Sequence, residues 1–228
     1  MNTVLIANPK GGSGKSTLSV NIAGYLANNG QRVAMLDLDR QQSSALWLAT
    51  RPADLPPIRM LDGQNKHDRF PLSTFPPQAG ERANESLREF RTYDWLVIDS
   101  PAGLHGKNLD HAIRLASKII VPVAPSLFDL HASSDFLRTL AEEKAVRKSK
   151  CQIGIVGMRM EMRTKAAWAL EHFLSTLDLP VLAYLRETQV YVNAAFEGKS
   201  IFDLPSHLAA RDIEQWAFLQ DWLPKIRD

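Results

Sequence analysis

Short apolar runs alternate with stretches of helical periodicity along most of the chain. The apolar runs predict strands at residues 4–7, 32–36, 58–61, 95–99, 119–123, 153–157 and 181–185. The stretches between them repeat apolar residues every three or four positions, which predicts helices at 18–29, 43–49, 85–91, 108–116, 131–148 and 164–177. Strands that alternate with helices form parallel sheets covered by helices. We therefore predict an α/β fold, with a doubly wound, mainly parallel sheet flanked by helices.

Residues 51–82 interrupt this alternation. Prolines at positions 52, 56, 57, 71, 76 and 77 break any regular pattern there. We interpret this segment as a long surface excursion within a single domain that spans residues 1–228, since a chain of this length can bury a substantial α/β core. Near the end, Trp216, Leu219, Leu223 and Ile226 follow helical spacing, which predicts a helix docked on the core.

The composition is that of an ordinary globular protein, with 45% hydrophobic and 23% charged residues. The net charge of +2 gives no global field that would demand nucleic acid, and leaves room only for a local basic patch. Cys151 is the sole cysteine, so no internal disulfide can form. The first residues carry no basic stretch and no apolar run approaches 18 residues, so we expect no signal peptide, no membrane span and a cytoplasmic protein.

The segment Asn8-Pro9-Lys10-Gly11-Gly12-Ser13-Gly14-Lys15-Ser16-Thr17 joins the first strand to the first helix. Glycines lack a Cβ, so their backbone N–H groups can close around phosphate oxygens, and a helix N-terminus adds its positive end. We expect Lys15 to reach the β- and γ-phosphates, Ser16 to bind Mg²⁺ and Thr17 to reach the α-phosphate side. The segment therefore predicts a binding loop for ATP with Mg²⁺. A glycine-rich turn with incidental lysines, or a dinucleotide loop, explains it less well.

Two groups of carboxylates end predicted strands. Asp99 closes the apolar run at 95–99, where a Walker B aspartate orders Mg²⁺, although it could simply cap the strand. No glutamate follows it, so a general base is absent there. Asp37 and Asp39 follow the run at 32–36 and could complete the site or merely solvate the end of the strand.

The segment 10–17 resembles the deviant Walker A loop of the ParA/MinD family, with Pro9 where the standard pattern has glycine and Lys10 as a second lysine. Residues 99–103 resemble the Walker B segment of the same family. The resemblance implies an ATPase in which Lys10 crosses the interface of an ATP-bound homodimer and contacts the partner's phosphates. It also implies that Asp39 positions the attacking water and that Asp37 lies near Mg²⁺. Arg40 stands where the family usually has proline.

Further segments, at 121–129, 186–191 and 197–202, resemble small plasmid partition ATPases, in which they lie near the adenine and the dimer face. Many relatives carry asparagine at the strand end that here reads Gly157-Met158-Arg159, which leaves adenine recognition open. Across a dimer, a set of basic side chains could form a patch for the DNA backbone, and a solvated surface is the alternative. The candidates are Arg159, Arg163, Lys165, Arg186 and Lys199.

Three functions remain open from the sequence. The first is a ParA-type switch that dimerises on ATP, binds DNA without sequence preference on the nucleoid, and is released when a partner protein on a plasmid, chromosome or protein cargo stimulates slow hydrolysis. The second is a MinD-like membrane switch, which we do not favour because Pro224 interrupts the C-terminal pattern and only Lys225 and Arg227 are basic there. The third is a metabolic enzyme on the same fold, such as a dethiobiotin synthetase-like ligase, which would not need Lys10.

Overall fold

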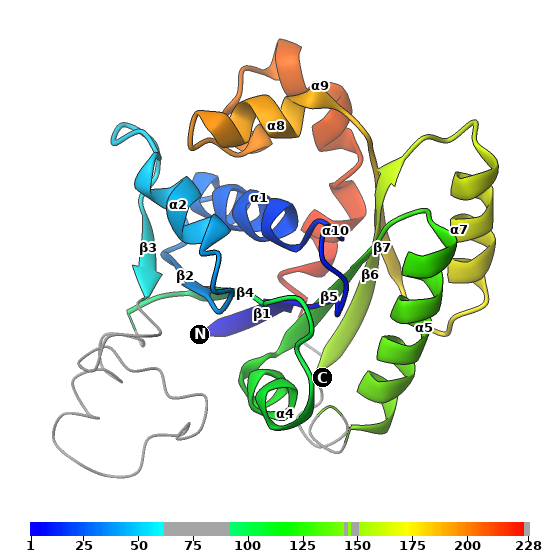
Figure 1. Ribbon diagram of the computed structural model, residues 1–228. Helices are drawn as coiled ribbons and strands as arrows, with labels where there is room; N and C mark the ends of the chain where they lie inside the picture. The colour runs from blue at the N-terminus through cyan, green and yellow to red at the C-terminus, as the bar shows by residue number, and fades with distance from the viewer. Residues whose placement is uncertain (62–91, 144–145, 147–150, 226–228) are drawn as a thin grey trace, which may run out of the picture.

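The computed structural model describes residues 1–61, 92–143, 146 and 151–225. The strands of this part form one parallel sheet in the order β3-β2-β4-β1-β5-β6-β7 (Figure 1). They are β1 (Asn2–Ile6), β2 (Val33–Asp37), β3 (Ile58–Leu61), β4 (Trp95–Asp99), β5 (Lys118–Val123), β6 (Gln152–Met160) and β7 (Val181–Arg186). The predicted fold class is confirmed, and every neighbouring pair of these strands is parallel.

Helices cover both faces of the sheet (Figure 1). The helices are α1 (Lys15–Asn28), α2 (Ser43–Ala49), α4 (Gly106–Leu115), α5 (Leu127–Glu142), α7 (Lys165–Ser175), α8 (Gln189–Phe196), the 3₁₀ helix η1 (Ile201–Asp203), α9 (Ser206–Glu214) and α10 (Ala217–Trp222). Alternate strand residues face opposite layers, because side chains in a strand alternate. Leu5 packs with the α4, α5 and α7 side, whereas Val4 and Ile6 pack with α1 and α10.

The order of the strands in the sheet has its switch point at β1: β2, β3 and β4 lie on one side of it, and β5, β6 and β7 lie on the other. Its neighbours are β4 on one side and β5 on the other, and the chain leaves β1 directly into the glycine-rich loop and α1. In open α/β sheets, ligands bind outside the carboxyl ends of the strands at such a reversal. The topology therefore places residues 8–17 where a ligand site is expected.

Two sequence predictions differ from the structure in detail. The fifth helix begins at Leu127 instead of residue 131, because the Ser126 hydroxyl accepts a hydrogen bond from the Asp129 N–H at 3.1 Å and caps it. The C-terminal pattern that starts at Trp216 forms only the short helix α10, which ends at Trp222, and Trp216, Leu219 and Leu223 are buried as predicted. The predicted helix at 85–91 and Ile226 lie outside the described residues. None of the helices in the described ranges is both long and apolar enough to cross a bilayer.

Candidate functional site

The glycine-rich loop has open space on its outer side. Gly12 and Gly14 have φ angles of 71° and 95°, which L side chains rarely adopt, and a Cβ added at Gly11 or Gly12 would meet nothing within 4 Å. The loop is anchored from beneath by Asn8, whose Nδ2 donates to the Pro122 carbonyl at 2.7 Å and whose Oδ1 accepts from the Lys10 N–H at 2.8 Å. The backbone amides therefore have room for an anion on their open side.

This loop borders a cavity of about 500 Å³. One wall comes from the loop and the start of α1, and another from the turn after β2, with Asp39, Gln41 and Ser43. The third wall comes from the ends of β6 and β7 and the start of α8. Its residues are Met158, Arg159, Leu185, Arg186, Glu187, Thr188, Gln189, Tyr191 and Val192. The cavity has the size of a small-molecule site and lies at the carboxyl edge of the sheet.

Lys15 is a buried cation under this loop. Its Nζ donates to the Lys10 carbonyl at 2.8 Å. Burial lowers the pKa of Lys15, and the charges of Asp99 and Asp39 oppose this effect. An ammonium held in a partly dry cavity between carboxylates attracts a phosphate strongly, because the local dielectric constant is low. The position therefore fits the predicted role on the β- and γ-phosphates.

Asp99 ends β4 as a completely buried carboxylate. Its Oδ2 accepts a hydrogen bond from the Ser44 hydroxyl, whereas its Oδ1 has no partner among the described residues. Burial raises the pKa of Asp99 to about 6; the hydrogen bond from Ser44 opposes this rise and the charge of Asp37 adds to it. An unpaired buried carboxylate oxygen is costly, and a hard cation satisfies it. The donor set therefore fits Mg²⁺, which Asp99 and Ser16 would hold beside the phosphates of a nucleotide.

We expect Asp99→Asn to stabilise the metal-free protein at pH 7.5. A carboxyl whose pKa is about 6 in the fold and 3.8 when exposed binds more protons in the folded state between those values. The contribution of Asp99 to the free energy of unfolding therefore falls as the pH rises from about 4 to about 6. Asparagine carries no charge, so above that range Asp99→Asn should be more stable than wild type by about 1–3 kcal/mol. Thermal unfolding with EDTA at pH 4 and pH 7.5 measures this, with the exposed carboxylate variant Asp54→Asn as control. Equal stability of Asp99→Asn and wild type at pH 7.5 would contradict the assigned burial cost.

Asp37 organises the turn between β2 and α2. Its Oδ1 accepts from the Asp39 N–H at 2.9 Å, and its Oδ2 accepts from the N–H groups of Ser44 at 2.9 Å and Ala45 at 3.2 Å. Burial raises the pKa of Asp37, and these three hydrogen bonds oppose the rise. Asp37 therefore caps the N-terminus of α2. The part near Mg²⁺ that the family resemblance implies for it stays a prediction.

Asp39 lines the cavity on a turn that forms without proline. Its Oδ1 accepts from the Gln41 N–H at 3.0 Å, and its carbonyl accepts from the Gln42 N–H at 3.1 Å. Arg40 occupies the exposed tip of the turn, and Gln42 closes it with a left-handed φ of 51°. Arg40 is therefore compatible with a turn that presents Asp39 to the cavity.

Lys10 is held by its backbone and not by its side chain. Its N–H is bound by Asn8, and its carbonyl accepts from the Lys15 Nζ and from the Ser13 hydroxyl at 3.2 Å. Across the part of the chain that the structure describes, no carboxylate forms an ion pair with the Lys10 ammonium. The Lys10 side chain is thus half-buried at the rim of the loop, without an ion-pair partner among the described residues.

The five basic residues predicted to form one DNA patch lie in three different settings. Arg159 and Arg186 line the nucleotide-sized cavity, and the Arg186 guanidinium also binds Asp212 through bonds of 2.7 and 2.9 Å. Lys199 pairs with the Glu197 carboxylate at 2.7 Å. Arg163 and Lys165 are exposed at the start of α7. The patch across a dimer stays a prediction, and Arg163 and Lys165 are the two candidates that are exposed away from the cavity and from any ion pair among the described residues.

Residues 197–203 fasten α8 to α1 and α2, a role that the sequence analysis missed. Arg51 and Asp203 form a buried bidentate ion pair with bonds of 2.9 and 3.0 Å. Gly198 has a φ of 64°, and a Cβ there would lie 2.4 Å from the Thr50 carbonyl. The Trp47 indole donates to the Lys199 carbonyl at 3.1 Å. The segment 186–191 borders the cavity, and residues 197–203 pack against α1 and α2. That the two segments lie near the adenine and the dimer face stays a prediction.

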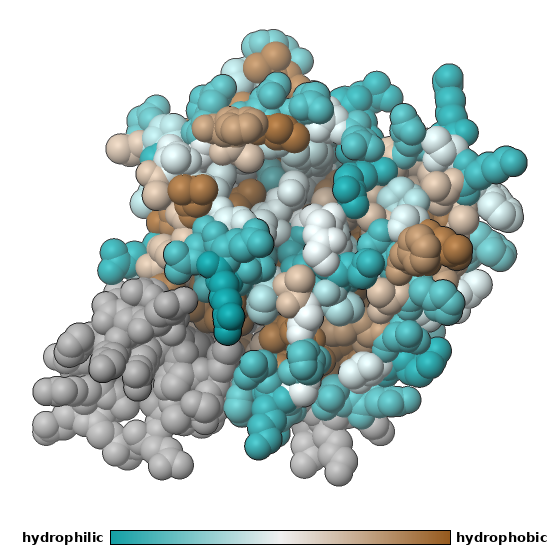
Figure 2. Space-filling model, in the orientation of Figure 1, coloured by the Kyte–Doolittle hydropathy of each residue, from teal (hydrophilic) through white to brown (hydrophobic). Residues whose placement is uncertain are grey.

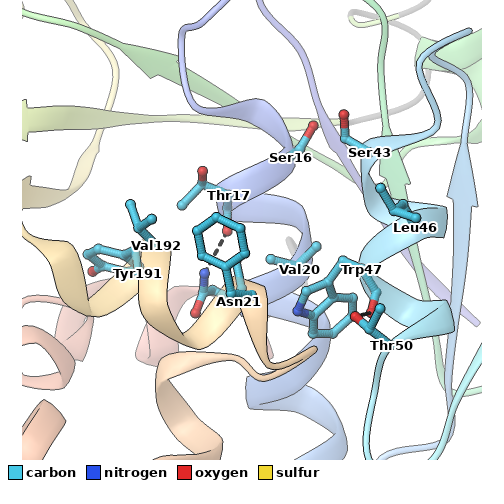
Figure 3. A pocket seen from close by; sticks show the side chains of 12 residues that line it. Ser16, Thr17, Val20, Asn21, Ser43, Leu46, Trp47, Thr50, Tyr191 and Val192 are labelled. Carbon is cyan, nitrogen blue, oxygen red and sulfur yellow. Dashed lines mark hydrogen bonds between the residues drawn. The ribbon is translucent and has the colours of Figure 1, made fainter.

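A second, apolar cavity of about 450 Å³ lies between α1, α2 and α8 (Figure 3). Val20 forms its floor, Leu46 and Trp47 line it from α2, and Val192 and Phe196 line it from α8. It shares Ser16, Thr17, Ser43, Tyr191 and Val192 with the first cavity. Leu46 is 69% exposed and Phe196 is 84% exposed. Apolar surface accordingly lies over α2 and α8, on the face that carries the loop (Figure 2).

The family model described as ATPase MipZ matches residues 2–171, which is most of the chain. The chain belongs to the ParA/MinD family of ATPases. Its glycine loop and the turn with Asp39 line one cavity, and Asp99 lies buried behind it, close enough to influence the pKa of Lys15.

Individual relatives agree with this membership. The chain is 31% identical over 221 residues to the maintenance of carboxysome distribution protein A of Halothiobacillus neapolitanus, with 93% of each chain covered. It is 30% identical over 185 residues to the chromosome-partitioning ATPase Soj of Thermus thermophilus, which covers 74% of this ParA/MinD chain and 73% of Soj.

Solved structures share the fold at lower identity. The ATP complex of a Cyanothece McdA variant has a TM-score of 0.71 at 18% identity, covering 100% of this ParA/MinD chain and 98% of that one. The Mg-ADP complex of MinD from Pyrococcus horikoshii has a TM-score of 0.68 at 19% identity, covering 97% and 96%. These similarities support the fold. The bound ATP and Mg-ADP are features of those two structures.

Proposed function

We propose that this protein is a ParA-type ATPase switch. It binds ATP with Mg²⁺, forms a homodimer in that state, and binds DNA without sequence preference on the nucleoid in the cytoplasm. A partner protein on a cargo stimulates slow hydrolysis to ADP and phosphate, which releases the dimer. The observation that carries this proposal is the pair of lysines on one loop. Lys15 is buried under the glycines, and the Lys10 ammonium at the rim forms no ion pair with any residue that the structure describes.

The two lysines fit different phosphates. Lys15 lies under its own loop, near Asp39 and Asp99, so it serves a nucleotide bound in the same chain. The Lys10 side chain starts from the outer end of the loop, where a second chain bound face to face would place its own phosphates. A cation supplied in trans stabilises charge that develops during phosphoryl transfer. The exposed apolar side chains of Leu46 and Phe196 on the same face are surface that such a partner would cover.

The relatives suggest the type of cargo. Two of them are named for carboxysome distribution and for chromosome partitioning. The proposed cargo is accordingly a plasmid, a chromosome or a protein assembly that is moved over DNA. The stimulating partner is then the protein that decorates this cargo.

The described C-terminal residues favour DNA over a membrane as the surface that the protein binds. Trp216, Leu219 and Leu223 are almost fully buried against the sheet, with exposures of 0%, 0% and 1%. Apolar side chains packed in the core cannot insert into lipid, which a membrane-binding amphipathic helix requires. We therefore assign the docking role to DNA.

We expect the double substitution of Arg163 and Lys165 by glutamate to weaken DNA binding by about tenfold or more at low salt. A dimer presents each basic residue twice, and counterion release scales with the number of phosphates neutralised. The loss should be equal for all sequences, and the salt dependence should flatten. Arg186 is left unchanged because glutamate there would face Asp212.

The measurement is a fluorescence-anisotropy titration with ATP and random-sequence duplex DNA. The control is Lys107→Glu with Arg211→Glu, which makes the same change in charge at exposed positions on α4 and α9. If the control loses as much affinity as the test variant, or if the test variant loses none, the DNA surface is not at Arg163 and Lys165.

A further inference from the structure

Ser44 links Asp37, which is half-buried, to the fully buried Asp99. It lies at the start of α2 and is completely buried, as is Asp99. Its hydroxyl donates to Asp99 Oδ2, and its backbone N–H donates to Asp37 Oδ2 at 2.9 Å. One residue therefore connects the end of β2 with the end of β4 through two separate hydrogen bonds.

The hydrogen bond from Ser44 determines which oxygen of the Asp99 carboxylate is left without a partner among the described residues. Asp99 stands on a central strand with no exposed surface, so its side chain can turn only within a packed site. The Ser44 hydroxyl holds Oδ2, and Oδ1 is the oxygen that has no partner among the residues described. Ser16, whose hydroxyl also opposes the rise in the pKa of Asp99, is in reach of the same carboxylate. Oδ1 is thus the carboxylate oxygen left for a cation.

We propose that Ser44 is a positioning residue for Mg²⁺, which holds the Asp99 carboxylate so that Oδ1 is presented to the cation. This inference rests on the proposed Mg²⁺–ATP site and adds a residue that does not touch the nucleotide. Groups that hydrogen-bond a metal-ligating carboxylate from behind fix its orientation, and their removal weakens metal binding.

A purely structural role for Ser44 makes a different prediction. The N-terminus of α2 is capped by Asp37, which accepts from the backbone N–H groups of Ser44 and Ala45. Alanine at position 44 keeps both of those N–H groups and removes only the hydroxyl that binds Asp99. The cap therefore survives Ser44→Ala, and the variant isolates the bond to the carboxylate.

The test measures Mg²⁺ binding without turnover. Calorimetry gives the affinity of a non-hydrolysable ATP analogue in EDTA, and a Mg²⁺ titration gives the metal concentration at half-maximal effect. We expect Ser44→Ala to raise this concentration about tenfold or more and to leave the affinity in EDTA unchanged. Ser44→Thr, which keeps a hydroxyl, should recover most of the loss. Ser206→Ala, at the exposed start of α9, is the matched control and should behave as wild type.

Two results would overturn the inference: an unchanged Mg²⁺ midpoint, or an equal loss of analogue affinity with and without Mg²⁺. If Ser44→Ala does not fold, Ser44→Cys keeps the volume, replaces a strong donor by a weak one, and carries the same expectation. Wild-type protein that binds the analogue with no response to Mg²⁺ would contradict the proposed function, and this inference with it. A failure of DNA binding alone would contradict only the proposed function.

Discussion

Lys15→Ala is expected to abolish ATP binding at ordinary nucleotide concentrations. The Lys15 ammonium is the cation under the glycine loop, and it is held there by the Lys10 carbonyl at 2.8 Å. Charge-assisted hydrogen bonds contribute about 1.5–3 kcal/mol each, so losing contacts to two phosphates should weaken binding about 100-fold or more. Removing the ammonium also leaves the triphosphate facing Asp39 and Asp99 without a counter-charge.

Calorimetry with ATP and Mg²⁺ checks this expectation, and circular dichroism confirms that the variant is folded. Lys107→Ala, which removes an exposed lysine on α4, is the control and should bind ATP as wild type does. An unchanged ATP affinity in Lys15→Ala would mean that the nucleotide does not bind at this loop.

Asp39→Ala and Lys10→Ala are expected to separate ATP binding from hydrolysis. Asp39 lines the cavity without holding the glycine loop, so Asp39→Ala should still bind ATP and dimerise. Its turnover should fall about 100-fold or more, because positioning of the attacking water is lost. Lys10→Ala keeps the backbone groups that hold the loop, so it should bind ATP as a monomer and fail to reach the dimer that hydrolyses it.

Single-turnover hydrolysis of labelled ATP, with sedimentation of the same samples, measures both effects. The control is Arg40→Ala, on the exposed tip of the same turn, which should bind ATP and dimerise normally. A Lys10→Ala variant that dimerises and turns over ATP like wild type would rule out the role of this lysine in trans. Normal turnover in Asp39→Ala would mean that a residue other than Asp39 positions the attacking water.

Features that depend on local sequence were predictable. The parallel sheet follows from periodicity, and the glycine loop and Asp99 at the end of a strand follow from the spacing of short motifs. In the structure the loop lines a cavity at the carboxyl edge of the sheet, and Asp99 ends β4 at the same edge. The buried C-terminal residues Trp216 and Leu219 also follow from helical spacing. Such signals are complete within about a dozen residues, so no long-range contact is needed to interpret them.

Features that depend on distant pairs were not predictable. The hydroxyl of Ser44 meets Asp99 across 55 positions, and Arg51 meets Asp203 across 152. Arg186 was grouped with exposed cations, but α9 brings Asp212 against it. A charge or a hydroxyl in a sequence shows what it can bind, whereas the fold decides which partner it finds.

We expect ATP, and not ADP, to turn this protein into a DNA-binding dimer. Sedimentation velocity of a fluorescent random-sequence duplex with the protein tests it directly, because the sedimentation of the labelled DNA reports binding and the mass of the complex reports the state of the protein. With ATP and Mg²⁺ we expect the duplex to sediment with protein dimers and to be released as salt is added. With ADP the duplex should sediment alone. A duplex that sediments alone in ATP, while the same protein binds anionic liposomes in an ATP-dependent manner, would contradict the proposed DNA-binding dimer. That result would indicate a membrane switch.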